Sequence, residues 1–150
     1  MKYFTINELT KSSTAARLGI NNAPGPVEKG NLTQLVEHVL DPLREAWGKP
    51  IRVSSGYRCP KLNKVVGGAI NSQHTKGQAA DITSLTDDWN ENLKLLKLLL
   101  NSDIEFDQVI CEYPDAQGRP NWIHVSYNKN GNRKKKTTCV KGHYINGINI

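Results

Sequence analysis

The stretch QVICEYPDAQGRPNWIHVSY, residues 108–127, decides the fold class of this chain. Its two ends, Gln108–Tyr113 and Trp122–Tyr127, are rich in β-branched and aromatic residues, which is typical of β-strands. The loop between them, Pro114–Pro120, contains proline, glycine and aspartate, which favour turns, so an antiparallel hairpin is the simplest connection. Because mostly helical patterns precede this hairpin, we predict an α+β fold.

The residues before the hairpin predict two long helices and several shorter elements. Between Leu32 and Trp47, apolar residues recur at steps of three and four positions, and Gly48 ends the pattern. Pro42 lies inside this helix and predicts a kink or a break. The other expected elements are helices over 5–18 and 87–100, a helical turn over 60–66, and strands over 51–54 and 78–82.

The composition is that of one domain with a modest hydrophobic core. The chain has 150 residues, of which 37% are hydrophobic. No apolar run approaches the roughly 20 residues that a membrane helix needs, and the first residues show no secretory signal. The three cysteines are far apart and never form a CxxC pair, which excludes a disulfide framework and a cysteine-rich zinc module.

The positive charge of the chain is concentrated at its C-terminal end. Residues 129–150 contain six basic and no acidic side chains, whereas residues 1–128 carry 14 of each sign. We therefore predict a domain over 1–128 and a basic C-terminal tail over 129–150. A neutral body argues against nucleic acid as a partner. The run Arg133–Lys136 could contact an anionic polymer of the cell envelope, or only keep the chain soluble.

Two histidines and one aspartate lie in surroundings that predict a metal site. His74 lies in a polar loop that contains glycine, Asp81 lies in a predicted strand, and His124 lies in the middle of another. Burying such groups without partners costs several kcal/mol. Two imidazoles and one carboxylate suit zinc and leave a fourth position for water. The alternatives are a closed site completed by Cys111, or polar side chains satisfied by hydrogen bonds alone.

Three segments occur in an order that is specific in combination. They are SSGYR at 54–58, SQHTKGQAAD at 72–81 and WIHVS at 122–126. With their surroundings, from about residue 5 to residue 128, they resemble the M15 metallopeptidases, which include the D-alanyl-D-alanine carboxypeptidases, and in particular the M15A type of bacteria and their phages. The resemblance implies a small antiparallel sheet flanked by helices, a fold shared with the hedgehog signalling domain.

The resemblance also implies a role for each matched position. His74, Asp81 and His124 match the three zinc ligands. Arg58 matches an arginine that stabilises the scissile carbonyl oxygen or holds a substrate carboxylate, and a guanidinium suits either task. Ser72 matches a position beside the first ligand that supports the site or touches the substrate.

This sequence differs from many relatives at the residue expected to act as the general base, which takes a proton from the attacking water. They carry an acid three residues before the last ligand, where this chain has Asn121, which cannot take a proton. We predict that Glu112 replaces it. Glu112 would share a face with His124 if it paired opposite His124 or the residue two positions before it, whereas a one-residue slip would turn it away. The weaker candidates are Asp107, at a strand start, and Asp115, in the hairpin loop.

Taken together, these features predict a zinc-dependent peptidase that cleaves D-amino-acid-containing peptides of bacterial peptidoglycan. Glu112 would take a proton from the attacking water and pass it to the leaving amine, and Arg58 would share the developing negative charge. The bond stays open between a terminal D-Ala-D-Ala, cut by a carboxypeptidase, and an internal L-Ala-D-Glu bond, cut by an endopeptidase.

The expected location follows from the two ends of the chain, and the competing functions follow from Asn121, the hedgehog relation and the basic tail. With no signal peptide and a basic tail, we expect an enzyme of phage or prophage type, made in the cytoplasm and acting at the cell wall or in the periplasm after release. One alternative is a catalytically inactive zinc-containing module that binds the cell wall. Another is a polyanion-binding protein whose important part is residues 129–150.

Overall fold

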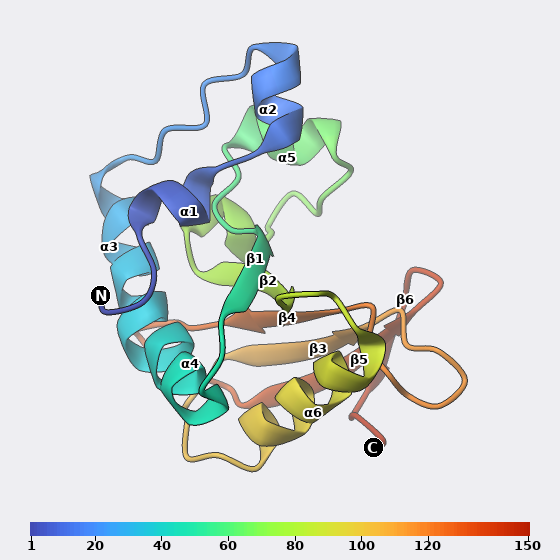
Figure 1. Cartoon of the computed structure of the whole chain (residues 1–150). Helices are drawn as coiled ribbons and strands as arrows, with labels where there is room; N and C mark the ends of the chain where they lie inside the picture. Colours follow the sequence, from blue (N-terminus) through green and yellow to red (C-terminus); the bar gives the residue numbers. More distant parts are fainter.

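A six-stranded sheet forms the centre of the molecule, in a computed structural model that describes residues 1–150 (Figure 1). The strands are β1 (Ile51–Ser55), β2 (Ala79–Ser84), β3 (Gln108–Glu112), β4 (Trp122–Ser126), β5 (Lys135–Val140) and β6 (His143–Asn146). Their order in the sheet is β1-β2-β4-β3-β5-β6, and every neighbouring pair is antiparallel except β3 with β5. The predicted hairpin of β3 and β4 and the α+β class are confirmed.

The helices occupy most of the chain before β3. They are α1 (Ile6–Thr10), α2 (Ser13–Leu18), α3 (Pro26–Leu35), the π-helical turn η1 (Val36–Leu40), α4 (Asp41–Trp47), α5 (Pro60–Val65), the 3-10 turn η2 (Gln73–Lys76) and α6 (Trp89–Leu100). None of these helices is both long enough and apolar enough to cross a membrane.

Two of the expected helices are interrupted, each for a local reason. The helix expected over 5–18 is two helices, because Lys11 is extended and the Ser12 side chain caps α2. The interruption expected at Pro42 takes the form of the π-helical turn η1 immediately before α4. Proline has no amide hydrogen to donate to the carbonyl four residues earlier, and the wider turn accommodates that loss.

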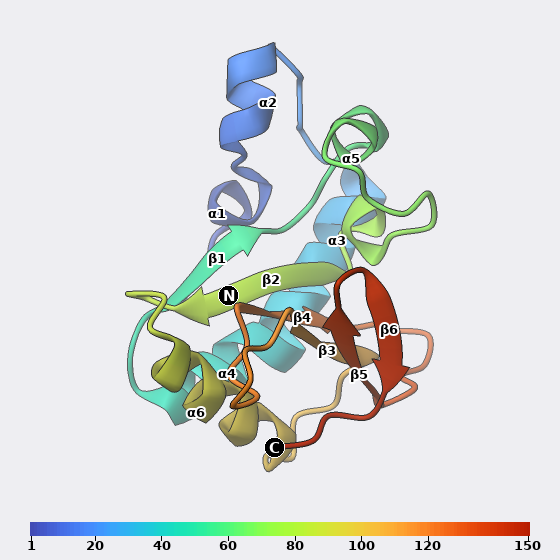
Figure 2. The ribbon, with the colours of Figure 1, turned by 90° about the vertical axis from the view of Figure 1, so that its right-hand side faces the viewer.

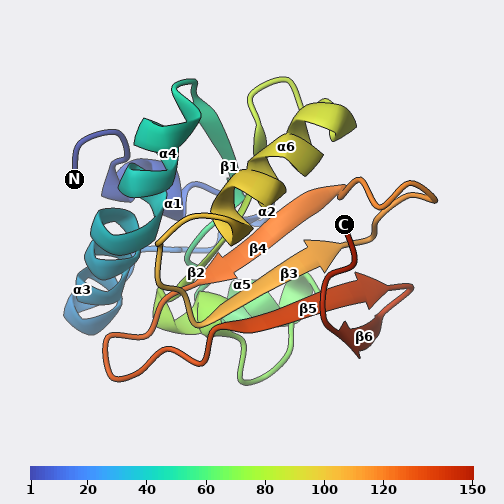
Figure 3. The same cartoon turned by 90° about the horizontal axis from the view of Figure 1, so that it is seen from below.

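The hydrophobic core lies between one face of the sheet and the helices α3, η1, α4 and α6, which cover that face in Figure 3. Ile82 on β2 and Ile123 and Val125 on β4 point into this core and are fully buried. Since successive side chains of a strand point to opposite faces, Asp81 and His124 point to the other face. Figure 1 shows α2 and α5 on that other side of the sheet from α6.

The C-terminal segment differs from the expected basic tail, because it adds two strands to the sheet. β5 pairs with β3 and β6 pairs with β5, so that they form one edge of the sheet (Figure 2). Thr137 and Cys139 on β5 are buried. Arg133, which precedes β5, donates to the buried Asp107 with an Nη2–Oδ2 distance of 2.7 Å. The positive charge of residues 129–150 indicated a tail, although β5 begins with only two exposed lysines and β6 contains none.

Candidate metal centre

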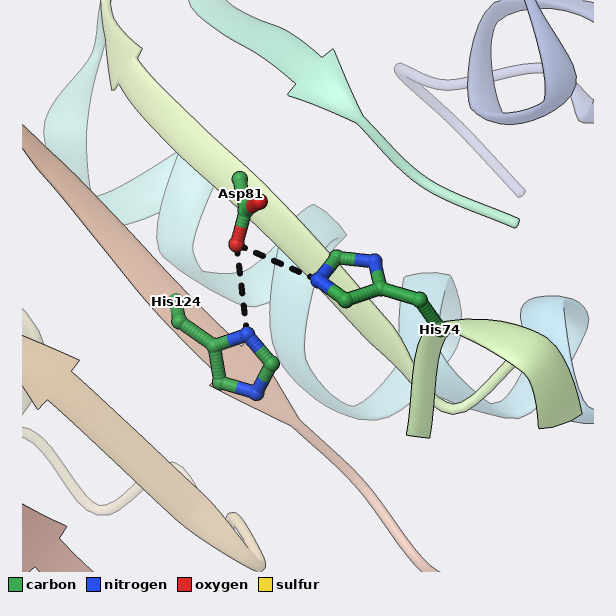
Figure 4. A group of neighbouring side chains, drawn as sticks. All are labelled: His74, Asp81 and His124. Carbon is green, nitrogen blue, oxygen red and sulfur yellow. Dashed lines mark hydrogen bonds and ion pairs between the residues drawn. The ribbon is translucent and has the colours of Figure 1, made fainter. Parts of the chain in front are cut away.

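The three predicted metal ligands meet on the face of the sheet opposite the hydrophobic core (Figure 4). Asp81 on β2 lies directly opposite His124 on β4. One oxygen of Asp81, Oδ1, lies 3.2 Å from His124 Nδ1 and 3.3 Å from Nε2 of His74, which extends from η2. The three ligand atoms lie within 4.8 Å of one another, so one metal ion could contact all of them.

The ring of His74 is oriented by contacts with the backbone. Its Nδ1 lies 2.7 Å from the carbonyl oxygen of Gly56, and because a carbonyl only accepts, we assign the ring proton to Nδ1. Nε2 is then left with a free lone pair that faces Asp81, as in metal-binding histidines whose other nitrogen donates to a carbonyl. The Ser72 side chain caps η2 by accepting from the amide of His74.

Gly56 is required at this place by the close approach of α1. A Cβ on Gly56 would collide with the backbone carbonyl of Leu9, which accepts the amide hydrogen of Tyr57 at 2.7 Å. The glycine of the SSGYR segment therefore lets the chain pass between α1 and His74. Its own carbonyl is thereby available to His74.

The charge of Asp81 suits a cation. Burial by itself would raise the pKa of Asp81, but the charge of His74 in its protonated form and the hydrogen bond with His124 outweigh it and hold that pKa below its usual range. The donor set of two imidazoles and one ionised carboxylate fits zinc. No fourth histidine, cysteine, aspartate or glutamate joins the group, so a fourth position is left for water or substrate.

Cys111 does not complete the site, and this rules out the closed structural site considered from the sequence. It pairs opposite Ile123 and belongs to the hydrophobic core, on the face of the sheet away from His124. Burial, and then the charge of Glu112, raise the pKa of its thiol to about 11. A neutral thiol in the core is a small hydrophobic side chain and no metal ligand.

Glu112 lies on the same face of the sheet as the metal ligands. It pairs opposite Trp122, which is two residues before His124 on β4. Glu112 is only 7% exposed, and burial, followed by the charge of Asp81, raises its pKa to about 7. A carboxylate with such a pKa can take up and release a proton near neutral pH.

The other two acids considered as the general base form ion pairs outside the cleft. Asp107 is bound by Arg133, and Asp115 by Arg119, whose Nε lies 2.6 Å from the Asp115 carboxylate. Neither side chain lines the cleft over the metal centre, and Asn121 does not line it either. Among the candidates from the sequence, only Glu112 is in position to act on a ligand in this cleft.

A cleft of about 400 Å³ opens over the three metal ligands and is also lined by Glu112, Arg58 and Ser72. Arg58 is fixed through its backbone, whose amide donates to the carbonyl of His74 at 3.1 Å. Its Nε is buried and has no hydrogen-bond partner. Burial lowers the pKa of Arg58, although the charge of Asp81 opposes that effect. Because Arg58 lines the cleft, its guanidinium is a cation suited to an oxygen atom of a substrate.

Two further features of the cleft were not predicted from the sequence. A smaller polar recess of about 280 Å³ adjoins the cleft and shares Arg58 and Asp81 with it. Aromatic side chains also line the cleft, namely Tyr113, Trp122 and Tyr144. The alternation along β4 indicated that Trp122 shares a face with His124, but no local pattern placed Tyr144 near them.

Comparison with known proteins gives two matches. The family model described as Peptidase M15 matches residues 2–126, which include all the candidate site residues and end before β5. Over 44 residues the chain is 50% identical to the zinc D-Ala-D-Ala carboxypeptidase of Streptomyces albus G. That stretch is 29% of this chain and 17% of the relative, so the similarity spans a small part of the relative's length.

Proposed function

The chain belongs to the peptidase M15 family, and we propose that it is a zinc-dependent peptidase acting on D-amino-acid-containing peptides of bacterial peptidoglycan. The observation that carries this proposal is the convergence of His74, Asp81 and His124 beside Glu112 in one cleft. The donor set fits zinc, and the carboxylate beside it has the proton affinity of a general base. The name of the Streptomyces relative supports both the metal and the substrate class.

In the proposed reaction each side chain has a separate task. His74, Asp81 and His124 would hold a zinc ion, which would supply Lewis acidity toward the scissile carbonyl and the attacking water. Glu112 takes a proton from that water and later gives it to the leaving amine. Arg58 donates hydrogen bonds to the carbonyl oxygen as negative charge develops on it, or to a carboxylate of the substrate.

Between the two candidate bonds, the contacts of Arg58 favour the terminal D-Ala-D-Ala bond. Arg58 lines both the cleft and the adjoining polar recess, and its positive charge there could receive the free carboxylate of a terminal residue. The alternative reaction within the proposal is cleavage of the internal L-Ala-D-Glu bond. We propose that the enzyme acts on either substrate at the cell wall or in the periplasm after release, as an enzyme of phage or prophage type.

The experiment that tests the proposal uses the zinc-loaded protein and a stem peptide that contains both bonds. Mass spectrometry of the products identifies which bond is cut, and a chelator followed by added zinc shows whether the metal is needed. We expect loss of one D-Ala, abolished by the chelator and restored by zinc. A peptide that stays intact would contradict the proposal, and binding without cleavage would indicate the inactive cell-wall-binding module instead.

A further inference from the structure

Four side chains form a continuous row across the last four strands of the sheet. Glu112 pairs opposite Trp122 in one direction and opposite Cys139 in the other, and Cys139 pairs opposite Tyr144. Paired residues on neighbouring strands point to the same face. All four side chains line the cleft over the metal centre. The row therefore connects the candidate base directly to the C-terminal hairpin formed by β5 and β6.

The C-terminal hairpin forms one side of the cleft. Cys139, Gly142 in its turn, and Tyr144 all line the cleft, and Figure 2 shows β5 and β6 side by side at this edge of the sheet. These residues lie outside the part of the chain that matches the family model, which ends at residue 126. The hairpin is thus a part of the cleft that the family match does not account for.

Tyr144 has the properties of a residue that contacts a ligand. Its side chain is 66% exposed although it lines the cleft, so much of its surface is available for contact. A tyrosine ring can pack on aliphatic groups while its hydroxyl donates or accepts a hydrogen bond. The neighbouring Cys139 is only 2% exposed and fills the space between Tyr144 and Glu112.

We propose that Tyr144 is a substrate-contacting residue that makes the enzyme prefer long stem peptides to short ones. This inference rests on the proposed function, because the ligand is the same peptide. Tyr144 is two strands away from Glu112, a distance of about 10 Å at the usual spacing of strands. An extended peptide covers about 3.3 Å per residue, so Tyr144 would contact a residue about three positions from the scissile bond. A dipeptide would not reach it.

The test compares Tyr144→Ala with Ile145→Ala, its neighbour on β6. Ile145 is 54% exposed, pairs opposite Thr138 and does not line the cleft, so it is a matched control. The values of kcat/KM are measured with zinc-loaded proteins on a stem pentapeptide and on acetyl-D-Ala-D-Ala. Dissociation constants are measured by calorimetry with the same zinc-loaded proteins carrying Glu112→Gln in addition, so that the peptide is not consumed during the titration. We expect Tyr144→Ala to weaken binding and kcat/KM for the pentapeptide by about tenfold, the usual size of a lost aromatic contact, with no change for the short substrate. Ile145→Ala should match the wild type on both.

Each outcome decides the inference. Equal affinity of the wild type and Tyr144→Ala for the pentapeptide would overturn it, as would an equal loss on both substrates. If the wild type binds the pentapeptide without cleaving it, the proposed function fails, while the comparison of affinities still decides the role of Tyr144. If the wild type does not bind the pentapeptide at all, the inference and the proposed substrate class both fail.

Discussion

Glu112 lies directly opposite Trp122 in the antiparallel pairing of β3 with β4. This register puts Glu112 on the face that carries His124, while Cys111 and Ile123 point into the core. A shift of one residue would exchange the faces and leave a thiol, in place of a carboxylate, beside the metal ligands. The pairing of these two strands is therefore what supplies the cleft with a candidate base.

The first prediction concerns Glu112 itself. Glu112→Gln should fold and bind zinc but lose about 10²–10⁴ in kcat, the usual contribution of a positioned general base. The base must be ionised to act, so the wild-type rate should fall as the pH drops below the pKa of Glu112. That acid limb should vanish in the variant. The measurement is a pH–rate profile of both proteins, with Glu105→Gln, at an exposed position, as the control. Turnover close to that of the wild type would rule Glu112 out.

The second prediction concerns the metal. His74→Ala removes one of three ligands, so the purified variant should contain much less zinc than the wild type and should unfold at a lower temperature in the presence of zinc. His143→Ala, at an exposed position of β6, should keep one equivalent of zinc and serves as the control. Metal analysis and thermal unfolding measure these effects. Full zinc content in His74→Ala would show that the ligand assignment is wrong.

The third prediction tests whether Arg58 acts only through its positive charge or also through the planar arrangement of its guanidinium donors. Arg58→Lys keeps a cation in the cleft, but an ammonium cannot reproduce the planar set of donors of a guanidinium. We expect a decrease in kcat/KM of about 10²-fold or more, as for loss of an oxyanion donor, with zinc still bound. Arg52→Lys, on an exposed position of β1 outside the cleft, should behave like the wild type. Unchanged kinetics for Arg58→Lys would remove Arg58 from the site.

The fourth prediction concerns position 121, where many relatives carry an acid. From sequence spacing alone, Asn121→Asp would be expected to restore activity to Glu112→Gln. Asn121 does not line the cleft, and its backbone is held by Glu112 and Asn92. The double variant should therefore be as inactive as Glu112→Gln alone. Recovered peptide hydrolysis in the double variant would show that position 121 reaches the cleft after all.

Local patterns in the sequence were sufficient for the elements whose caps and periodicity are strong. The helix α6 begins after its cap Asp88, and β4 shows the alternation that separates His124 from the core residues beside it. Asp81 and His124 were candidates because polar residues in strands need partners, and the resemblance to the M15 metallopeptidases implied that they and His74 form the ligand set. Their convergence in the structure agrees with that expectation.

Long-range pairing could not be predicted in the same way. The sequence left the register of β3 against β4 conditional, because two registers differ by one residue and no local feature of either strand selects between them. The strands β5 and β6 were missed because residues 129–150 were interpreted from their charge, six basic side chains and no acidic one. The parallel pairing of β5 with β3 and the position of Tyr144 in the cleft were missed for the same reason.

The most direct test of the account is a zinc titration of the metal-free protein, with hydrolysis of a stem peptide as the readout. If His74, Asp81 and His124 form one catalytic zinc site, the rate should rise in proportion to added zinc and level off at one equivalent. The same titration of His74→Ala should show no such saturable rise. Hydrolysis that persists in the metal-free protein, or a wild type that binds one zinc and cleaves nothing, would contradict the account.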